Sequence, residues 1–306
     1  MTMIETRGLT KEYGDVTAVT EVDLTVDRGD IHGFVGHNGA GKTTTMQMLT
    51  GLVTPTRGEA YIGGEPAGTR AATKKIGYAP QDPAFYESMT GRDYLTYMGE
   101  LSAVDGSTRE RADELLTRLN LTDAADQAVE GYSGGMLRRL AVGQAMLGDP
   151  ELLILDEPTA ALDPEGRAMI IDALESLTDE GTTIFVSSHV LTELEQFIDT
   201  VTFLKEGQVV TSGPLTEVLS DTGIERFVVD ASDNDRAARL LATHESVDEV
   251  DRNDDGAVVV RTDDPEGFAV ALPQALSDAT LGLYSVDREG GLEERFLDIL
   301  DDGGED

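Results

Sequence analysis

The sequence predicts an α/β fold, with a larger unit over residues 1–220 and a small C-terminal α+β unit over residues 221–306. Apolar runs at residues 31–35 and 152–155 each end at a loop of glycine or acidic residues, which is typical of buried parallel strands in a doubly wound sheet. Between them, apolar side chains recur at helical spacing without a strand signal. This pattern predicts a helical subdomain at about residues 82–148.

The composition is that of an ordinary globular protein with an unusual charge. Of its 306 residues, 40% are hydrophobic, and no apolar run approaches the ~20 residues that span a bilayer. The N-terminus has no charged-then-apolar leader. We therefore expect a cytoplasmic protein that reaches a membrane only by docking on a membrane protein. The absence of cysteine excludes disulfides, thiolate metal sites and cysteine nucleophiles.

Acidic residues outnumber basic ones by 59 to 23, which gives a net charge of −36. Such a surface repels itself at low salt, whereas molar salt shortens the screening length to ~3 Å. The charge therefore predicts a salt-adapted cytoplasm, and an acidic protein of a mesophile stays open as the alternative. It also argues against nucleic acid as a partner, because nucleic-acid binding relies on Lys and Arg contacts to phosphates.

The first strands lead to a glycine-rich loop. Residues 3–8 and 16–26 are expected to form strands joined by a turn that carries Tyr13. Tyr13 would stack on a nucleobase if a nucleotide bound nearby, or it is an ordinary turn residue.

Residues 36–43 read Gly-His-Asn-Gly-Ala-Gly-Lys-Thr and follow the first apolar run. The spacing is that of a phosphate-binding loop, in which glycines let successive amides face a polyphosphate and the next helix adds its positive N-terminus. Lys42 is expected to reach the β- and γ-phosphates, and the Thr43 hydroxyl to ligate Mg²⁺. The ligand is therefore a nucleoside triphosphate. The residues expected to hold it are Gly36, Asn38, Gly39, Ala40, Gly41, Lys42, Thr43 and Thr44.

The second apolar run ends in two carboxylates. In a doubly wound sheet the ligand lies at the carboxyl ends of the strands, so Asp156 and Glu157 should face the phosphates. Asp156 is expected to hold Mg²⁺, directly or through water, and Glu157 to take a proton from the attacking water.

Other candidates carry weaker signals by themselves. Ser133 is a good helix N-cap, and Gly134 and Gly135 leave the amides of that helix open to a second anion. Gln81 follows a short strand and is either a site residue or a solvated amide. His189 ends the strand at residues 183–187 and could donate to a γ-phosphate oxygen. No metal role is assigned to the other histidines, His32, His37 and His244.

Together these motifs resemble the ATP-binding cassette (ABC) ATPases, a family of P-loop NTPases, over residues 1 to about 220. The resemblance rests on the phosphate loop, Gln81, residues 132–136, residues 152–157, residues 161–163 and His189, in the order and approximate spacing of the family. It implies that two cassettes pack head to tail around two ATP. It further implies that Tyr13 stacks on adenine, Gln81 senses Mg²⁺ and the attacking water, Ser133 and Gly135 cap the γ-phosphate across the dimer, His189 is the switch, and Asp163 couples the two sites.

Residues 133–136 and 148–151 look most like the ATPase subunits of ABC-2-type exporters. The resemblance implies an ABC-2-type membrane permease as partner, a second ATPase subunit that makes a homodimer, and a place on the inner face of the cell membrane. Permease docking is expected between Gln81 and Tyr94, and local packing of that loop is the alternative. A soluble ATP-driven switch without a permease also stays open, although relatives of that kind usually carry two cassettes or a long coiled coil.

The C-terminal stretch has strand and helix signals in the order β-α-β-β-α-β, which is the ferredoxin-like arrangement. A final helix is expected at residues 292–300. Because the stretch has no basic cluster and no ligand set, we expect an interaction or dimer-stabilising appendage. Small-molecule sensing is the alternative.

Overall fold

The computed structural model describes residues 1–102, 106–160, 162–188, 190–220, 225–253, 256–289 and 292. The chain divides into two compact units, Met1–Leu215 and Thr216–Asp306, so the division falls close to the expected boundary after residue 220. None of the helices in these described ranges is both long and apolar enough to cross a membrane.

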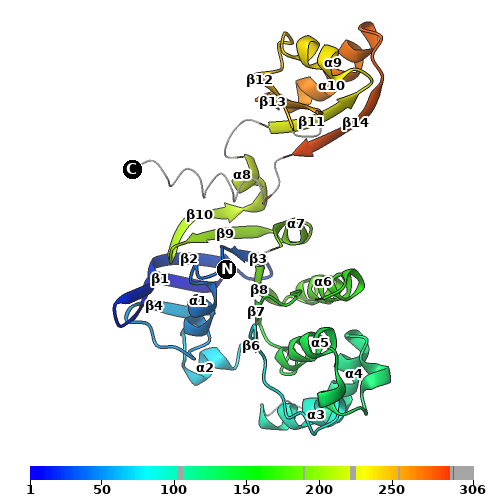
Figure 1. Cartoon of the computed structure of the whole chain (residues 1–306). Helices are drawn as coiled ribbons and strands as arrows, with labels where there is room; N and C mark the ends of the chain where they lie inside the picture. The colour runs from blue at the N-terminus through cyan, green and yellow to red at the C-terminus, as the bar shows by residue number, and fades with distance from the viewer. Residues whose placement is uncertain are drawn as a thin grey trace. The chain divides into compact units, whose positions relative to one another are not determined.

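A six-stranded sheet forms the centre of the first unit (Figure 1). Its strand order is β10-β9-β3-β8-β7-β6, and every neighbouring pair except β9 and β10 is parallel. All residues of β3, β7 and β8 are buried, as expected of parallel strands covered on both faces. The α/β prediction is therefore confirmed. The strands are β3 (Ile31–Val35), β6 (Ile76–Ala79), β7 (Leu152–Asp156), β8 (Thr183–Ser188), β9 (Thr200–Lys205) and β10 (Gln208–Pro214).

A second, antiparallel sheet packs beside the first, in the order β2-β1-β4-β5. Helix α1 (Lys42–Leu49) shares one hydrophobic core with both sheets, to which it contributes Met46, Met48 and Leu49. The sequence predicted that residues 3–8 form the first strand and that Tyr13 lies in the following turn. This was wrong, because the strand continues to Tyr13. Register shifts let the first strand pass Gly8 and continue to Tyr13, which pairs with Val16. The strands are β1 (Thr2–Tyr13), β2 (Val16–Asp27), β4 (Arg57–Ile62) and β5 (Glu65–Pro66).

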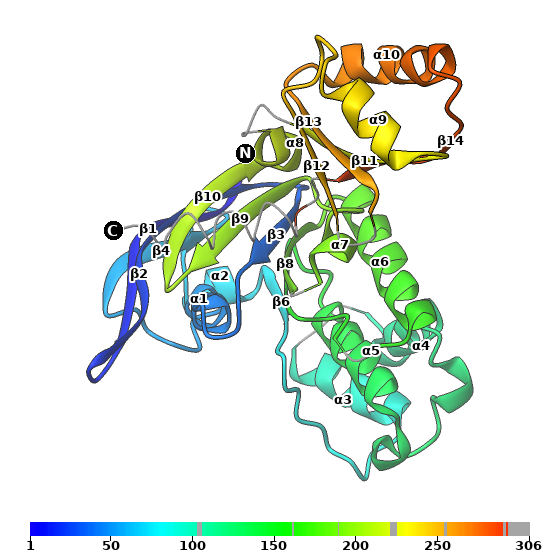
Figure 2. The same cartoon turned by 45° about the horizontal axis from the view of Figure 1, so that its top comes forward.

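The longer remaining helices of this unit, α3 to α6, lie on the other side of the parallel strands from α1, whereas the short helix α2 lies near α1 (Figures 1 and 2). The subdomain expected at about residues 82–148 contains three of them, and hydroxyl side chains cap each one: Thr90, Ser107 and Ser133. The helices are α3 (Gly91–Leu101), α4 (Thr108–Arg118), α5 (Gly134–Ala145) and α6 (Pro164–Asp179), with short turns at α2 (Arg70–Thr73), α7 (Leu191–Leu194), η1 (Thr122–Ala124) and η2 (Val129–Gly131).

The second unit begins with α8 (Leu215–Ser220) and contains an antiparallel sheet in the order β12-β13-β11-β14. Its elements follow the β-α-β-β-α-β order predicted from the sequence, and α9 and α10 share a core with the strands. The final helix expected at residues 292–300 lies outside the described residues apart from Leu292. The elements are β11 (Glu225–Ala231), α9 (Asn234–Leu241), β12 (Glu249–Arg252), β13 (Val258–Thr262), α10 (Pro265–Asp278) and β14 (Leu283–Glu289).

The central sheet contains a fully buried histidine. The two ring nitrogens of His32 on β3 form hydrogen bonds with the hydroxyls of Thr200 and Thr202, at 2.7 and 2.9 Å. The ring also stacks on Phe185. Burial lowers the pKa of His32 from its ordinary value of 6.5 to about 3. The folded state therefore favours the neutral ring.

This burial predicts a pH dependence of stability. Because the pKa of His32 is lower in the folded than in the unfolded chain, its contribution is fully present above pH 6.5 and is lost as the pH falls from 6.5 toward 3. Within that window, His32→Gln should reduce the slope of unfolding free energy against pH by up to about 1.4 kcal/mol per pH unit. Urea unfolding between pH 7 and 4.5 measures this slope. The control variant His244→Gln should keep the wild-type slope. An unchanged slope in His32→Gln would contradict a lowered pKa of His32 in the folded chain.

Candidate functional site

The loop between β3 and α1 wraps around a lysine. Gly41 has a φ of +103°, and a Cβ at Gly36 would lie 2.5 Å from the Leu204 carbonyl oxygen, so both positions require glycine. The Lys42 ammonium donates to the carbonyl oxygens of Gly36 and His37, at 2.6 and 3.2 Å. Burial lowers the pKa of Lys42, and the charges of Glu157 and Asp156 act in the opposite direction. The loop therefore presents a positive charge next to two carboxylates.

Two oxygen donors meet at the carboxyl ends of the strands. The Thr43 hydroxyl donates to Asp156 Oδ2 at 2.7 Å, while Asp156 Oδ1 accepts a hydrogen bond from the Ser187 hydroxyl, also at 2.7 Å. Hydroxyl and carboxylate oxygens are hard ligands, which Mg²⁺ prefers, and a site with one or two protein oxygens leaves room for phosphate and water. This pair of oxygens therefore fits Mg²⁺.

Glu157 lies next to this pair in an unusual backbone conformation. Its φ is +53°, which is uncommon for a residue with a side chain. Its N–H donates to the Ser187 hydroxyl and carbonyl oxygens at 3.1 and 3.2 Å, and the residue is buried. Strained residues of this kind occur often at functional sites.

Two further residues, which the sequence pattern did not single out, approach the site. The hydroxyl of Tyr78 on β6 is buried and has no hydrogen-bond partner among the described atoms. Burial raises the pKa of Tyr78 to about 12, with a smaller contribution from the charge of Asp156. From α5, Arg138 donates to the carbonyl oxygens of Gln81 and Pro80 at 2.7 and 3.3 Å. The exposed Gln81 is thus tied to the helix that begins after Ser133.

The turn before α5 is open to solvent. Ser133 and Gly134 are exposed, and the Ser133 hydroxyl accepts a hydrogen bond from the Met136 N–H at 3.3 Å. A Cβ added to Gly135 would lie 3.1 Å from the Leu162 side chain, so this turn lies close to Leu162. The next residue, Asp163, caps α6, because its side chain accepts a hydrogen bond from the Gly166 N–H. Among the described residues, no hydrogen bond joins this turn to the phosphate loop, and α5 and α1 lie on different sides of the strands (Figure 2).

The structure thus brings together Lys42, Thr43, Asp156 and Glu157, but places the Ser133 turn apart from them. Tyr13 ends β1 and is 47% exposed, and the Lys11 ammonium lies 5.0 Å from the centroid of its ring. The expected site residue His189, and residue 161 of the motif at residues 161–163, lie outside the described residues.

The chain is similar to a known protein family and to individual proteins. The family model described as "ABC transporter" matches residues 19–160. The chain is 36% identical to a daunorubicin resistance ATP-binding protein, DrrA3 of Streptomyces coeruleorubidus, over 98% of this chain and 96% of that protein. It is also 36% identical to the bacitracin transport ATP-binding protein BcrA of Bacillus licheniformis, over 85% of each chain.

Solved structures are similar as well. A dimeric bacterial ABC transporter cassette is matched with a TM-score of 0.65 and 27% identity, over 70% of this chain and 99% of that one. A dimeric post-hydrolysis cassette bound to ADP and phosphate gives a TM-score of 0.65 and 26% identity over the same shares of the two chains. With a phosphate loop, a carboxylate pair and near full-length relatives in agreement, this chain belongs to the ABC transporter family, as an ATP-binding subunit that hydrolyses ATP.

Proposed function

We propose that two copies of this chain close around two ATP molecules and drive export through a separate ABC-2-type membrane permease. The observation that supports this most is the convergence of Lys42, Thr43, Asp156 and Glu157 at one sheet edge, in a chain similar along nearly its whole length to a drug-resistance ATP-binding protein. The names of the relatives speak of resistance and transport, and export is the direction that resistance requires.

Each residue of the site has a role in this proposal. Lys42 and the loop amides bind the β- and γ-phosphates, and Thr43 and Asp156 hold Mg²⁺, which supplies positive charge to the phosphate oxygens. Glu157 accepts a proton from water, and Gln81 and His189 orient the reacting groups. Tyr13 would stack on adenine, a role that its exposure at the end of β1 supports.

A second copy completes the site. Ser133, Gly134 and Gly135 present an exposed helix N-terminus, which favours an anion, yet among the described residues no hydrogen bond joins it to the phosphate loop of its own chain. In a head-to-tail dimer this turn would cap the phosphates bound by the other copy, and Asp163, close to the Gly135 turn, would link the two sites. Dimeric cassettes among the similar structures support this arrangement.

The loop expected to meet the permease is only partly available. The Phe85 ring packs against Tyr94 with 5.3 Å between ring centroids, so local packing accounts for it. Tyr86 is 54% exposed and remains a candidate contact. Beside this region, β6, α2 and the ends of α3 and α5 enclose a pocket of about 640 Å³.

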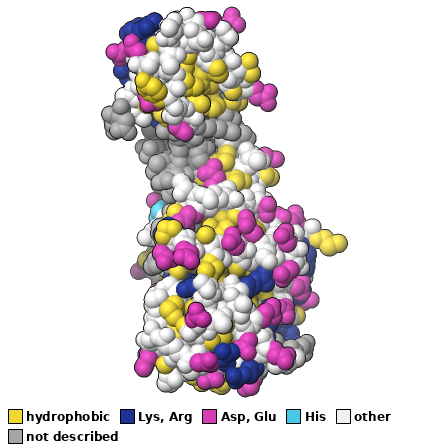
Figure 3. Space-filling view, turned by 90° about the vertical axis from the view of Figure 1, so that its right-hand side faces the viewer, with side chains coloured by type: hydrophobic (Ala, Val, Ile, Leu, Met, Phe, Trp, Pro, Cys, Tyr) yellow, Lys and Arg dark blue, Asp and Glu magenta, His cyan; other side chains and the backbone are white. Residues whose placement is uncertain are grey.

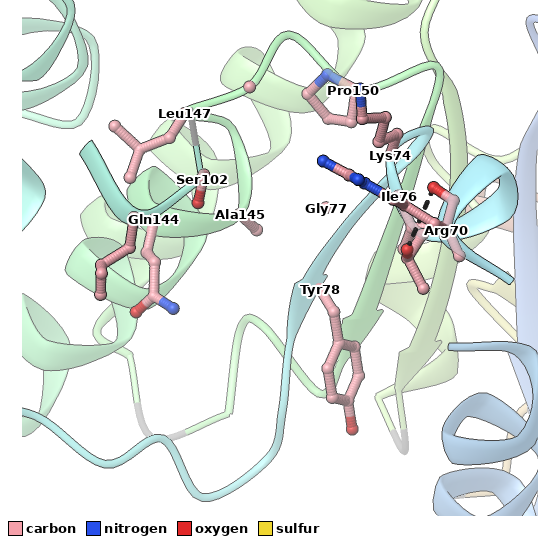
Figure 4. Close-up of a pocket in the computed structure, with 13 residues that line it drawn as sticks. Arg70, Lys74, Ile76, Gly77, Tyr78, Ser102, Gln144, Ala145, Leu147 and Pro150 are labelled. Carbon is pink, nitrogen blue, oxygen red and sulfur yellow. Dashed lines mark hydrogen bonds between the residues drawn. The ribbon is translucent and has the colours of Figure 1, made fainter. Parts of the chain in front are cut away.

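Basic side chains line this pocket in an otherwise acidic protein. Figure 4 shows Arg70 reaching across it toward Ala145 and Gln144, and Lys74 reaching toward Pro150. Both are exposed, and neither forms an ion pair within the described residues. Acidic side chains are scattered over the face of the molecule drawn in Figure 3. The pocket therefore suits an acidic segment of the permease.

Charge reversal tests this docking site. We expect Arg70→Glu/Lys74→Glu to reduce the membrane-bound fraction of the chain about tenfold in its host, because two attractive contacts become repulsive and tenfold corresponds to about 1.4 kcal/mol. ATP hydrolysis by the isolated variant should stay unchanged. Sedimentation of membranes followed by quantification of the chain measures the effect. The control is Arg109→Glu on α4, an exposed arginine outside the pocket; an equal loss in the control, or no loss in the double variant, would refute the docking site.

A further inference from the structure

Ser187, the fifth residue of β8, contacts both acidic residues of the site. Its hydroxyl donates to Asp156 Oδ1 at 2.7 Å and accepts from the Glu157 N–H at 3.1 Å. Its carbonyl oxygen accepts from the same N–H at 3.2 Å. The side chain is fully buried, at 0% exposure, so water does not compete for these bonds.

The first bond orients the Asp156 carboxylate. A carboxylate is planar, so fixing one oxygen sets the direction of the other. Ser187 fixes Oδ1, and Oδ2 then faces the Thr43 hydroxyl at 2.7 Å. Hydrogen bonds to a charged acceptor are among the stronger ones in proteins, which gives this contact the strength to hold a metal ligand in place.

The second bond supports the backbone of Glu157. A residue with φ near +53° stays in that conformation only where its surroundings hold it there. The Glu157 N–H finds both of its acceptors on Ser187, on the neighbouring strand. The direction in which the Glu157 side chain leaves the strand is therefore tied to Ser187.

We propose that Ser187 is a positioning residue that sets the Mg²⁺-facing oxygen of Asp156 and the base Glu157 with one hydroxyl. This inference rests on the proposed roles of those two residues. It assigns to Ser187 no contact with ATP, so its loss should affect the metal requirement and turnover more than nucleotide affinity.

Three variants test it. In Ser187→Ala, kcat should fall about tenfold and the Mg²⁺ concentration for half-maximal rate should rise several-fold, as expected when a charge-assisted hydrogen bond is lost. Calorimetric titration should show weaker binding of ATP with Mg²⁺ and unchanged binding of ATP in EDTA. Threonine keeps the hydroxyl and suits a strand, so Ser187→Thr should restore most of the wild-type kcat and Mg²⁺ dependence.

Ser188→Ala is the matched control. Ser188 is also buried on β8, but its hydroxyl bonds only to the backbone of Val190 among the described residues, at 2.9 Å to the N–H. Its kinetics and metal dependence should stay close to wild type. Wild-type kcat and Mg²⁺ dependence in Ser187→Ala, or an equal loss in Ser188→Ala, would overturn the inference. A wild-type chain that binds no ATP with Mg²⁺ would instead overturn the proposed function.

Discussion

Glu157→Gln is expected to slow ATP hydrolysis about 100-fold or more while ATP binding persists. General base catalysis contributes ~10²- to 10⁴-fold, and glutamine keeps the shape of the side chain but not its basicity. The N–H of residue 157 still reaches both acceptors on Ser187, so the unusual backbone conformation should survive the change.

Phosphate release from purified protein measures the rate, and calorimetry measures ATP binding. The matched control is Glu165→Gln, an exposed acid in the first turn of α6, which should hydrolyse ATP at the wild-type rate. An unchanged rate in Glu157→Gln would exclude Glu157 as the base. A loss of ATP binding would instead show that Glu157 has a structural role.

Ser133→Ala should reduce hydrolysis by about 10- to 100-fold, and the isolated chain should still bind ATP. Hydrogen bonds to charged groups are worth ~1.5–3 kcal/mol, which corresponds to this range. Among the described residues, no hydrogen bond joins the Ser133 turn to the phosphate loop of its own chain, so binding of ATP to a single copy should not depend on it.

The control for this variant is another capping serine. Ser107 caps α4 by accepting from the Glu110 N–H at 3.3 Å, in the same way that Ser133 caps α5. Each alanine variant loses an N-cap, at a cost of ~0.5–2 kcal/mol of stability, and only Ser133→Ala should lose turnover. Full turnover in Ser133→Ala would contradict the proposal that Ser133 of one copy contacts the ATP bound by the other.

The sequence was informative wherever local chemistry decides the structure. The phosphate loop requires glycine at Gly36 and Gly41 because backbone atoms lie close there, and those glycines at that spacing are visible in the sequence. The buried strand before Asp156 is a continuous apolar run, so its end at the sheet edge could be predicted too.

Residues that act through distant contacts could not be found in this way. Arg138 is one of several arginines, and only the packing of α5 beside the end of β6 brings it to Gln81. Tyr78 and Ser187 come from neighbouring strands whose pairing with β7 no local pattern reveals. The wrong turn before Tyr13 has a similar cause, because Gly8 suggests a break that pairing with β2 and β4 overrides.

The most direct test of the whole account is to tag the chain in its own host, solubilise the membranes gently in molar KCl, and identify what co-purifies. We expect a polytopic membrane protein at a fixed ratio to two copies of this chain, in a complex that hydrolyses ATP. Recovery of only soluble partners, or of none, while the chain still dimerises with ATP, would contradict the transporter role and favour an ATP-driven switch.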